Sequence, residues 1–272
     1  MKKILPILFV PVVVLSAGAQ TNTAATRADT PLQYIRLAAD DAAHVFSAPA
    51  RWDSDDWLAA GGCVALVGGA ALLDDPVSNY VHNHPNKSRD RIAKDIAPFG
   101  AEYSFAVLGT FFAAGEIAGS TNAVAVAGDG LISSVLAGGV ITPALKFACG
   151  RNRPKARKGA ADFSPFSGKA SFPSGHATQA FAVGATIAEH YDSLWVQIPA
   201  YAIPTLVGLS RIQREAHFPS DVVAGAIIGT SVARCVANHN RPAWGNISFA
   251  PVLGDDFIGL AAVFDFPTVG KK

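Results

Sequence analysis

The sequence is poor in charged residues, in methionine and in cysteine. Only 16% of its 272 residues are charged and a single one is methionine, whereas soluble proteins usually carry about 25% charged residues. The formal net charge of +1 excludes the strongly basic surface typical of nucleic-acid-binding proteins. Because half of the residues are hydrophobic, we predict either an exported protein with a large core or a protein partly embedded in a membrane.

The three cysteines, Cys63, Cys149 and Cys235, all lie in apolar segments. An odd number cannot pair completely, and their spacing matches neither a zinc site nor a redox motif. We therefore expect them to be small buried hydrophobic side chains. One disulfide bond stays compatible with an oxidising compartment.

The first residues resemble an export signal. Lys2 and Lys3 supply positive charge, residues 4–15 are apolar, and residues 17–19 match a small-x-small cleavage site. We predict a signal peptide over residues 1–19, a flexible leader over residues 20–30, and export to the periplasm or cell envelope. An uncleaved membrane anchor is the alternative interpretation.

Residues 31–240 contain a series of apolar runs rich in Ala and Gly, which predict one helical domain. The run 57–73 is uncharged, and both a buried core helix packed through its glycines and a membrane span are compatible with it. Glu116 and Asp129 interrupt later runs. Because a carboxylate in the middle of a bilayer is costly, these two residues favour a compact bundle outside the membrane.

Two regions outside the apolar runs are predicted to have other structures. Residues 79–95 are the most hydrophilic part of the chain and predict a solvated loop. His82 and His84, two positions apart, are weak evidence for a metal site, so none is predicted there. In the tail, residues 241–272, short apolar pieces flank residues 254–256 and are compatible with a β-hairpin.

Three separate pieces of the chain carry residues that suit a tetrahedral oxyanion. Fixed cations bind such an anion, one imidazole can attack it, and a second imidazole can handle a proton. The residues concerned are Lys146, Arg153, Ser174, Gly175, His176, Arg211, His217 and Asp221.

The local sequence around these residues supports an anion site. Ser174 precedes an apolar run and is well placed to cap a helix, and Gly175 lets the backbone approach a ligand closely. Amides exposed at the start of a helix bind anions readily. His217 and Asp221 are four apart, so one helical turn could bring the carboxylate to the imidazole nitrogen that does not react.

The segment 150–170 joins two of the pieces and is rich in cations. A lid over a cleft and a solvated connector are both compatible with its composition. Of its cations only Arg153 belongs to the pattern of candidate residues; the others include Arg151, Lys155, Arg157 and Lys158.

The spacings K-x6-RP, PSGH and SR-x5-H-x3-D resemble the signature of the type 2 phosphatidic acid phosphatase (PAP2) superfamily, which includes bacterial non-specific acid phosphatases and vanadium haloperoxidases. The resemblance implies an all-α helical bundle, here with the short C-terminal β-hairpin added, and a site without a metal. It implies His217 as nucleophile, His176 as general acid and base, and Asp221 as the residue that assists His217. The implied phosphate ligands are Lys146, Arg153, Ser174, Gly175 and Arg211.

The predicted function is that of a metal-independent phosphatase acting on a phosphate monoester or pyrophosphate through a phosphohistidine. Its substrate would be a lipid phosphate or a soluble ester, membrane association is compatible with the composition, and no nucleic-acid partner is expected. The alternatives are a vanadate-dependent haloperoxidase and a non-catalytic anion-binding or membrane protein. Vanadate is expected to inhibit a phosphatase and to serve a haloperoxidase as cofactor.

Overall fold

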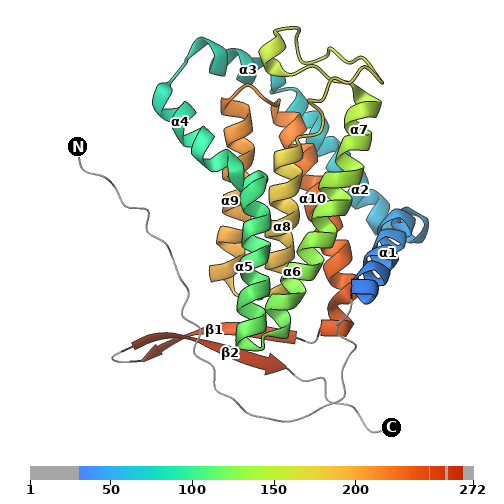
Figure 1. The fold of residues 1–272 in the computed structure, drawn as a ribbon. Coiled ribbons are helices and arrows are strands. Elements are labelled where there is room, and N and C mark those ends of the chain that lie inside the picture. Colours follow the sequence, from blue (N-terminus) through green and yellow to red (C-terminus); the bar gives the residue numbers. More distant parts are fainter. Residues whose placement is uncertain (1–30, 245, 255–256, 266–272) are drawn as a thin grey trace.

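The computed structural model describes residues 31–244, 246–254 and 257–265, so the predicted signal peptide and leader lie outside the described residues. The predicted helical bundle is confirmed (Figure 1). Its α-helices are α1 (Pro31–Ser47), α2 (Ser54–Ala71), α3 (Asp74–Asn83), α4 (Lys87–Ile96), α5 (Glu102–Ala118), α6 (Thr121–Ser133), α7 (Thr142–Cys149), α8 (Gly175–His190), α9 (Leu194–Gln213) and α10 (Pro219–Trp244). Shorter helical turns are η1 (Ala48–Arg51), η2 (Ala97–Gly100), η3 (Ser134–Ile141) and η4 (Pro154–Ala156).

The tail forms a short antiparallel hairpin of the kind that the sequence suggested. Strand β1 (Asn246–Gly254) pairs with β2 (Phe257–Asp265), with Asn246 opposite Asp265 and Gly254 opposite Phe257. Helix α10, which precedes the hairpin, runs from Pro219 to Trp244.

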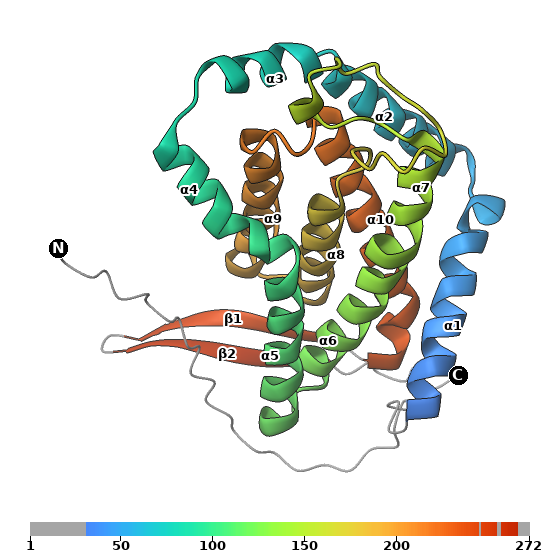
Figure 2. The same cartoon turned by 45° about the horizontal axis from the view of Figure 1, so that its top comes forward.

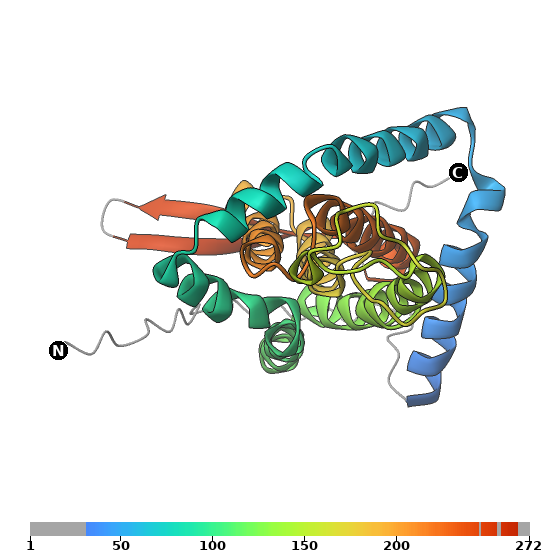
Figure 3. The same ribbon diagram turned by 90° about the horizontal axis from the view of Figure 1, so that it is seen from above.

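Helix α8 lies at the centre of the bundle, and seen from above α1 to α5 run around the outside of α6 to α10 (Figure 3). Helix α8 packs against α10 through the two glycines of the Gly-x-x-x-Gly motif. A Cβ atom on Gly225 would lie 2.6 Å from the carbonyl oxygen of Ser174, and one on Gly229 would collide with that of Thr178. Both glycines therefore let α10 pack closely against the first turn of α8, the helix that begins at the candidate site.

The carboxylate of Asp129 is buried but not isolated. It is fully enclosed, and it lies 2.8 Å from Nε2 of His190 and accepts a hydrogen bond from Asn240, which also donates to Asp41. The cost of a carboxylate facing lipid therefore does not arise at Asp129. For this residue, the argument against a membrane location was wrong.

Helix α2 is not the buried helix that one interpretation of residues 57–73 required. None of its residues is buried, and a Cβ atom on any of its four glycines would meet nothing within 4 Å. Together with α3 it forms one of three described helices that are long and apolar enough to cross a membrane. The other two are Thr121–Cys149 (α6, η3 and α7) and Pro219–Arg241 in α10.

The hydrophilic region 79–95 was wrongly predicted as a loop, because it contains the end of α3 and most of α4. Asn86 caps α4 by accepting hydrogen bonds from the amides of Ser88 and Arg89. Ile92 and Ile96 line a cavity together with residues of α9, and Ala93 is buried on the same side of a helix that is otherwise mostly hydrophilic. The three cysteines are free and partly buried, so no disulfide links them.

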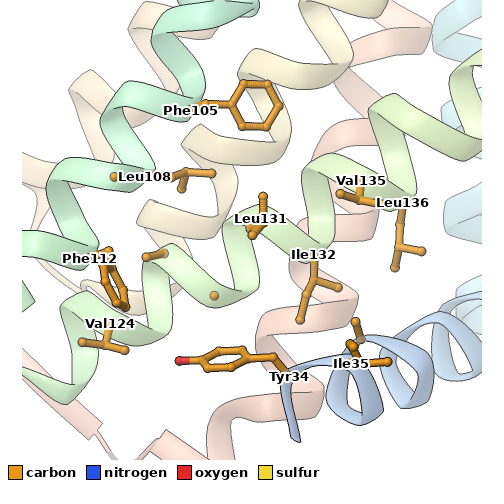
Figure 4. Close-up of a pocket in the computed structure, with 14 residues that line it drawn as sticks. Tyr34, Ile35, Phe105, Leu108, Phe112, Val124, Leu131, Ile132, Val135 and Leu136 are labelled. Carbon is orange, nitrogen blue, oxygen red and sulfur yellow. The ribbon is translucent and has the colours of Figure 1, made fainter. Parts of the chain in front are cut away.

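An apolar cavity of about 730 Å³ lies between α1, α5 and the long helix of α6 and η3 (Figure 4). Phe105 and Phe112 of α5 face Leu131 and Ile132 across it, and Tyr34 of α1 closes one side. None of the predicted site residues lines this cavity.

The glycine contacts predict the effect of two matched substitutions. We expect Gly229→Ala to lower the Tm by several degrees, because the added methyl group overpacks the α8–α10 contact at a cost of about 1–3 kcal/mol. Gly68→Ala in α2 meets no neighbour and should keep or raise the Tm, since alanine is the better helix former by about 1 kcal/mol. Thermal unfolding in detergent checks both; equal effects would contradict the packing argument.

Candidate active site

The predicted site residues come together where four helices end. Helices α7 and α9 finish at the same end of the bundle at which α8 and α10 begin (Figures 1 and 2). Lys146 lies in the last turn of α7, Arg211 near the end of α9, and His176 and Asp221 in the first turns of α8 and α10. The connection between α9 and α10 carries His217.

The imidazole of His217 is buried and held by its Nδ1 atom. This atom lies 2.8 Å from the carbonyl oxygen of Ser171 and 3.6 Å from the carboxylate of Asp221. Because a carbonyl only accepts, Nδ1 carries the hydrogen and Nε2 has a free lone pair. Burial, together with the positive charges of Lys146 and Arg211, lowers the pKa of His217 below its ordinary value, although Asp221 acts to raise it. The expected contact with Asp221 is present, but the nearer acceptor is Ser171, which the sequence analysis did not identify.

His176 lies in the first turn of α8, close enough to sense the charges of Arg211 and His217. Burial, followed by the charge of Arg211, lowers the pKa of His176 to about 4. Gly100 makes this position possible, because a Cβ atom there would lie 2.6 Å from the carbonyl oxygen of His176. At neutral pH the His176 imidazole is therefore uncharged in the free protein.

Ser174 and Gly175 form the start of α8 as predicted. Ser174 is the N-cap, its hydroxyl accepting from the amide of Ala177 at 3.5 Å, and it is fully buried. Its own amide donates to the carbonyl oxygen of Asp221 at 2.9 Å, which ties the starts of α8 and α10 together. A Cβ atom on Gly175 would lie 3.8 Å from Cε of Lys146, so the lysine side chain passes beside this turn.

Among the described residues, the three predicted phosphate-binding cations have no carboxylate partner. None of the ion pairs within the described part of the chain includes Lys146, Arg153 or Arg211. Lys146 donates instead to the carbonyl oxygen of Ala170 at 2.6 Å, and Arg153 is exposed at the start of η4. The Nε atom of Arg211 is buried without a hydrogen-bond partner. A buried donor without a partner is costly, and an anion bound here would satisfy it.

The sequence analysis missed Arg151, whose side chain is the most extensively bonded at the site. Only 3% of Arg151 is exposed, and its guanidinium lies 2.6 Å from the carboxylates of both Asp74 and Asp221. It also donates to Ser220 and to the carbonyl oxygen of Ala160, and it stacks on the rings of Phe163 and Phe218. Arg151 thus anchors the cation-rich segment 150–170 to α3 and α10.

A metal site is not apparent in this region. Among the residues that the structure describes, no three His, Cys, Asp or Glu side chains are grouped so that they could hold a metal ion. The acidic groups at the site are instead committed to Arg151, to hydroxyls and to backbone amides.

Comparison with known proteins gives a consistent result. Residues 130–242, which contain all eight predicted site residues, match the PAP2 superfamily. A lipid A 1-phosphatase from Rhizobium etli is 40% identical over 104 residues, covering 36% of this chain and 44% of that protein. Lipid phosphate phosphatase 2 from Arabidopsis thaliana is 32% identical over 165 residues, covering 46% of this chain and 57% of that protein. The matches thus span about half the length of these relatives.

Among solved structures, that of Aquifex aeolicus LpxE is similar to this chain. The sequence identity is 24% and the TM-score is 0.48, over 61% of this chain and 95% of the other.

The burial of His176 predicts how its protonation responds to an anion. Bound phosphate should favour the imidazolium form and raise the pKa of His176 from about 4 by at least about one unit. Reciprocally, phosphate should bind up to about tenfold more tightly as the pH falls from above the raised pKa to below the pKa of the free protein. Histidine NMR titrations with and without phosphate check the shift, and His176→Gln gives the baseline for phosphate's own protonation. An unchanged pKa would mean that phosphate does not bind beside His176.

Proposed function

We propose that this chain, whose residues 130–242 belong to the PAP2 superfamily, is a phosphatase that acts through a phosphohistidine on His217. The observation that carries the proposal is the anchored imidazole: with Nδ1 2.8 Å from the carbonyl oxygen of Ser171, Nε2 is left with a free lone pair. Lys146 and Arg211, which belong to no ion pair among the described residues, act on the imidazole with positive charge. A lone pair beside fixed positive charge suits attack on a phosphoryl group.

The reaction would proceed in two displacements. Nε2 of His217 forms a bond to phosphorus while the bond to the leaving oxygen breaks, and His176 gives that oxygen a proton. In the second step His176 takes a proton from water, whose oxygen attacks phosphorus and releases His217. Because His176 is neutral in the free protein, this proton must be gained when the substrate binds.

Protein groups would supply the charge stabilisation that metal ions provide in many phosphoryl-transfer enzymes. Lys146, Arg153 and Arg211 would bind the non-bridging oxygens, the arginines through forked contacts with two oxygens at once. The Gly175 amide at the start of α8 would add a neutral donor, with Ser174 holding that turn in place. We therefore propose that the reaction is independent of metal ions.

A lipid phosphate is the substrate class that we propose. The relatives named above are a lipid A 1-phosphatase and a lipid phosphate phosphatase. Among the described residues, three helices are long and apolar enough to cross a membrane, and two of them end or begin at the site. A lipid phosphate carries its phosphate at the membrane surface, where the ends of such helices lie.

We further propose export to the cell envelope, with the site facing away from the cytoplasm. Asp221 lies at the site and Asn240 contacts α1, and these residues are nineteen positions apart on α10, or about 28 Å at 1.5 Å per residue. This length is close to the roughly 30 Å of a bilayer core. In a membrane-spanning form α1 and the site would therefore lie on opposite faces.

This arrangement limits how the predicted signal peptide can be processed. Cleavage outside the cytoplasm would leave α1 on the outer side. An outward-facing site then requires either an uncleaved N-terminus in a spanning protein or a cleaved chain that does not span the membrane.

The proposed activity has a direct test. The purified protein should hydrolyse a chromogenic phosphate ester with or without chelator, vanadate should inhibit it, and His217→Ala should lower kcat at least about 10³-fold. His84→Gln, at an exposed histidine outside the site, serves as the control. Vanadate-dependent bromide oxidation with negligible hydrolysis would instead identify a haloperoxidase, and activity in neither assay a non-catalytic protein.

The substrate class is checked separately by comparing kcat/KM for a lipid phosphate in detergent micelles with that for a soluble ester. We expect the lipid to be favoured at least about tenfold, because its apolar part adds binding energy beside the common phosphate. A preference for the soluble ester would contradict the lipid proposal and leave the phosphatase proposal intact.

The orientation can be tested with single cysteines in a variant that lacks the three natural ones. Lys158→Cys at the site end should react with a membrane-impermeant maleimide in cells whose outer barrier is permeabilised, because it would face away from the cytoplasm. Arg36→Cys in α1 should react only after lysis. The opposite pattern would place the site on the cytoplasmic side. Reaction of both, with the N-terminus cleaved after Ala19, would indicate a chain that does not span the membrane.

A further inference from the structure

A chain of buried charges runs from α3 to the imidazole of His217. Asp74, in the first turn of α3, accepts from Nη2 of Arg151 at 2.6 Å and from the Ser220 hydroxyl at 2.6 Å. Arg151 in turn donates through Nη1 to Asp221 at 2.6 Å. Asp74 and Asp221 are fully buried.

The chain continues from Asp221 to the imidazole through Ser171. The Ser171 hydroxyl donates to Asp221 at 2.6 Å, and the Ser171 carbonyl oxygen lies 2.8 Å from Nδ1 of His217. The amide of Ser171 donates to the carbonyl oxygen of Arg151 at 3.0 Å. Arg151 therefore contacts both the carboxylate and the backbone that orient the imidazole.

The sum of the charges in this chain determines what the imidazole experiences. Two carboxylates and one guanidinium add up to one negative charge. Without Asp74 the guanidinium of Arg151 would neutralise Asp221, and the imidazole would face no net negative charge on its Nδ1 side. Attack by Nε2 leaves positive charge on the ring, so a retained negative charge at Nδ1 stabilises the transition state.

We propose that Asp74 is a positioning residue that acts through Arg151 to preserve the negative charge of Asp221 against His217. The inference rests on the proposed role of His217 and extends it to a residue 77 positions before Arg151 in sequence. Asp74 touches neither the imidazole nor, in this scheme, the substrate. It determines the net charge on the Nδ1 side of the His217 imidazole.

The other charged groups that face His217 are positive or neutral. Lys146 of α7 and Arg211 of α9 act on it with positive charge, and His176 of α8 is neutral near pH 7. Asp221 of α10 is therefore the one carboxylate among the groups that act on His217 in the described residues. If Arg151 neutralises Asp221 to a different extent, no second carboxylate among these groups compensates for the change at His217.

Two variants separate this role from a purely structural one. Asp74→Asn removes the negative charge, so we expect kcat to fall at least about tenfold and the pKa of His217 to move further down. Adding Arg151→Gln to Asp74→Asn restores one net negative charge, that of Asp221. The double variant should therefore regain part of the kcat lost in the single variant and a higher pKa of His217.

A structural role predicts the opposite pattern. A loosened site would admit water and move the pKa of His217 up towards its ordinary value, and the double variant would be less active than Asp74→Asn. Either result would overturn the proposal. Asp75→Asn is the matched control, because Asp75 lies on the same turn and its carboxylate accepts a hydrogen bond from the amide of Ala160 rather than from Arg151; its kcat should stay within about twofold of the parent's.

The measurements are kcat and kcat/KM against pH, the Tm of each variant, and histidine-ring NMR with His217 assigned by His217→Gln. If the double variant does not fold, Asp74→Glu decides: it keeps the charge, so the pKa of His217 should stay near that of the parent even if the Tm falls. A pKa lowered as in Asp74→Asn would refute the charge argument. The NMR titration also applies to a parent protein without phosphatase activity, so failure of the proposed function is distinguishable from failure of this inference.

Discussion

The burial of the Arg151 guanidinium is the constraint on which the site depends. A buried cation is tolerated only where its charge and all its donors are met, and here two carboxylates, a hydroxyl and a carbonyl oxygen meet them. These partners come from α3, from α10 and from the segment that follows α7. Removing any one would leave a buried donor of Arg151 without its partner, so the three segments hold one another in a single arrangement. The candidate site is thereby assembled before an anion arrives.

Cations in the same region are divided between two kinds of environment. Arg151 is fully paired, whereas Lys146, Arg153 and Arg211 belong to no ion pair among the described residues. Like charges close together are unfavourable, and the orphaned Nε of Arg211 adds a desolvation cost. A fold can hold such groups only if other contacts stabilise the surrounding helix ends, as the α8–α10 glycine contacts do. Binding of an oxyanion would relieve both costs at once.

The sequence predicted the members of the site better than the connections between them. The eight motif residues could be grouped because their spacings resemble the PAP2 signature. Arg151 could not be singled out, because it is one cation in a cation-rich segment and its partner Asp74 is far away in sequence. Residues 57–73 could not be assigned, since a core helix and a lipid-facing helix share the same apolar composition. Helix α4 was missed because few of its residues are apolar, although Asn86 and the pair Ile92 and Ile96 carried a signal.

The alternating direction of the helices explains why one end of the bundle can hold so many charges. Helix N-termini favour anions and C-termini favour cations, each by about 0.3–1 kcal/mol. Lys146 and Arg211 lie in the last turns of α7 and α9, while Asp221 and the free amides lie in the first turns of α10 and α8. Each charge is thus at the helix end that stabilises it. A bound phosphate would lie at the start of α8 and against both cations, so the backbone and the side chains favour the same ligand. In a bundle whose helices all ran in one direction, either the backbone dipoles or the side-chain cations would be unfavourably placed for the bound phosphate.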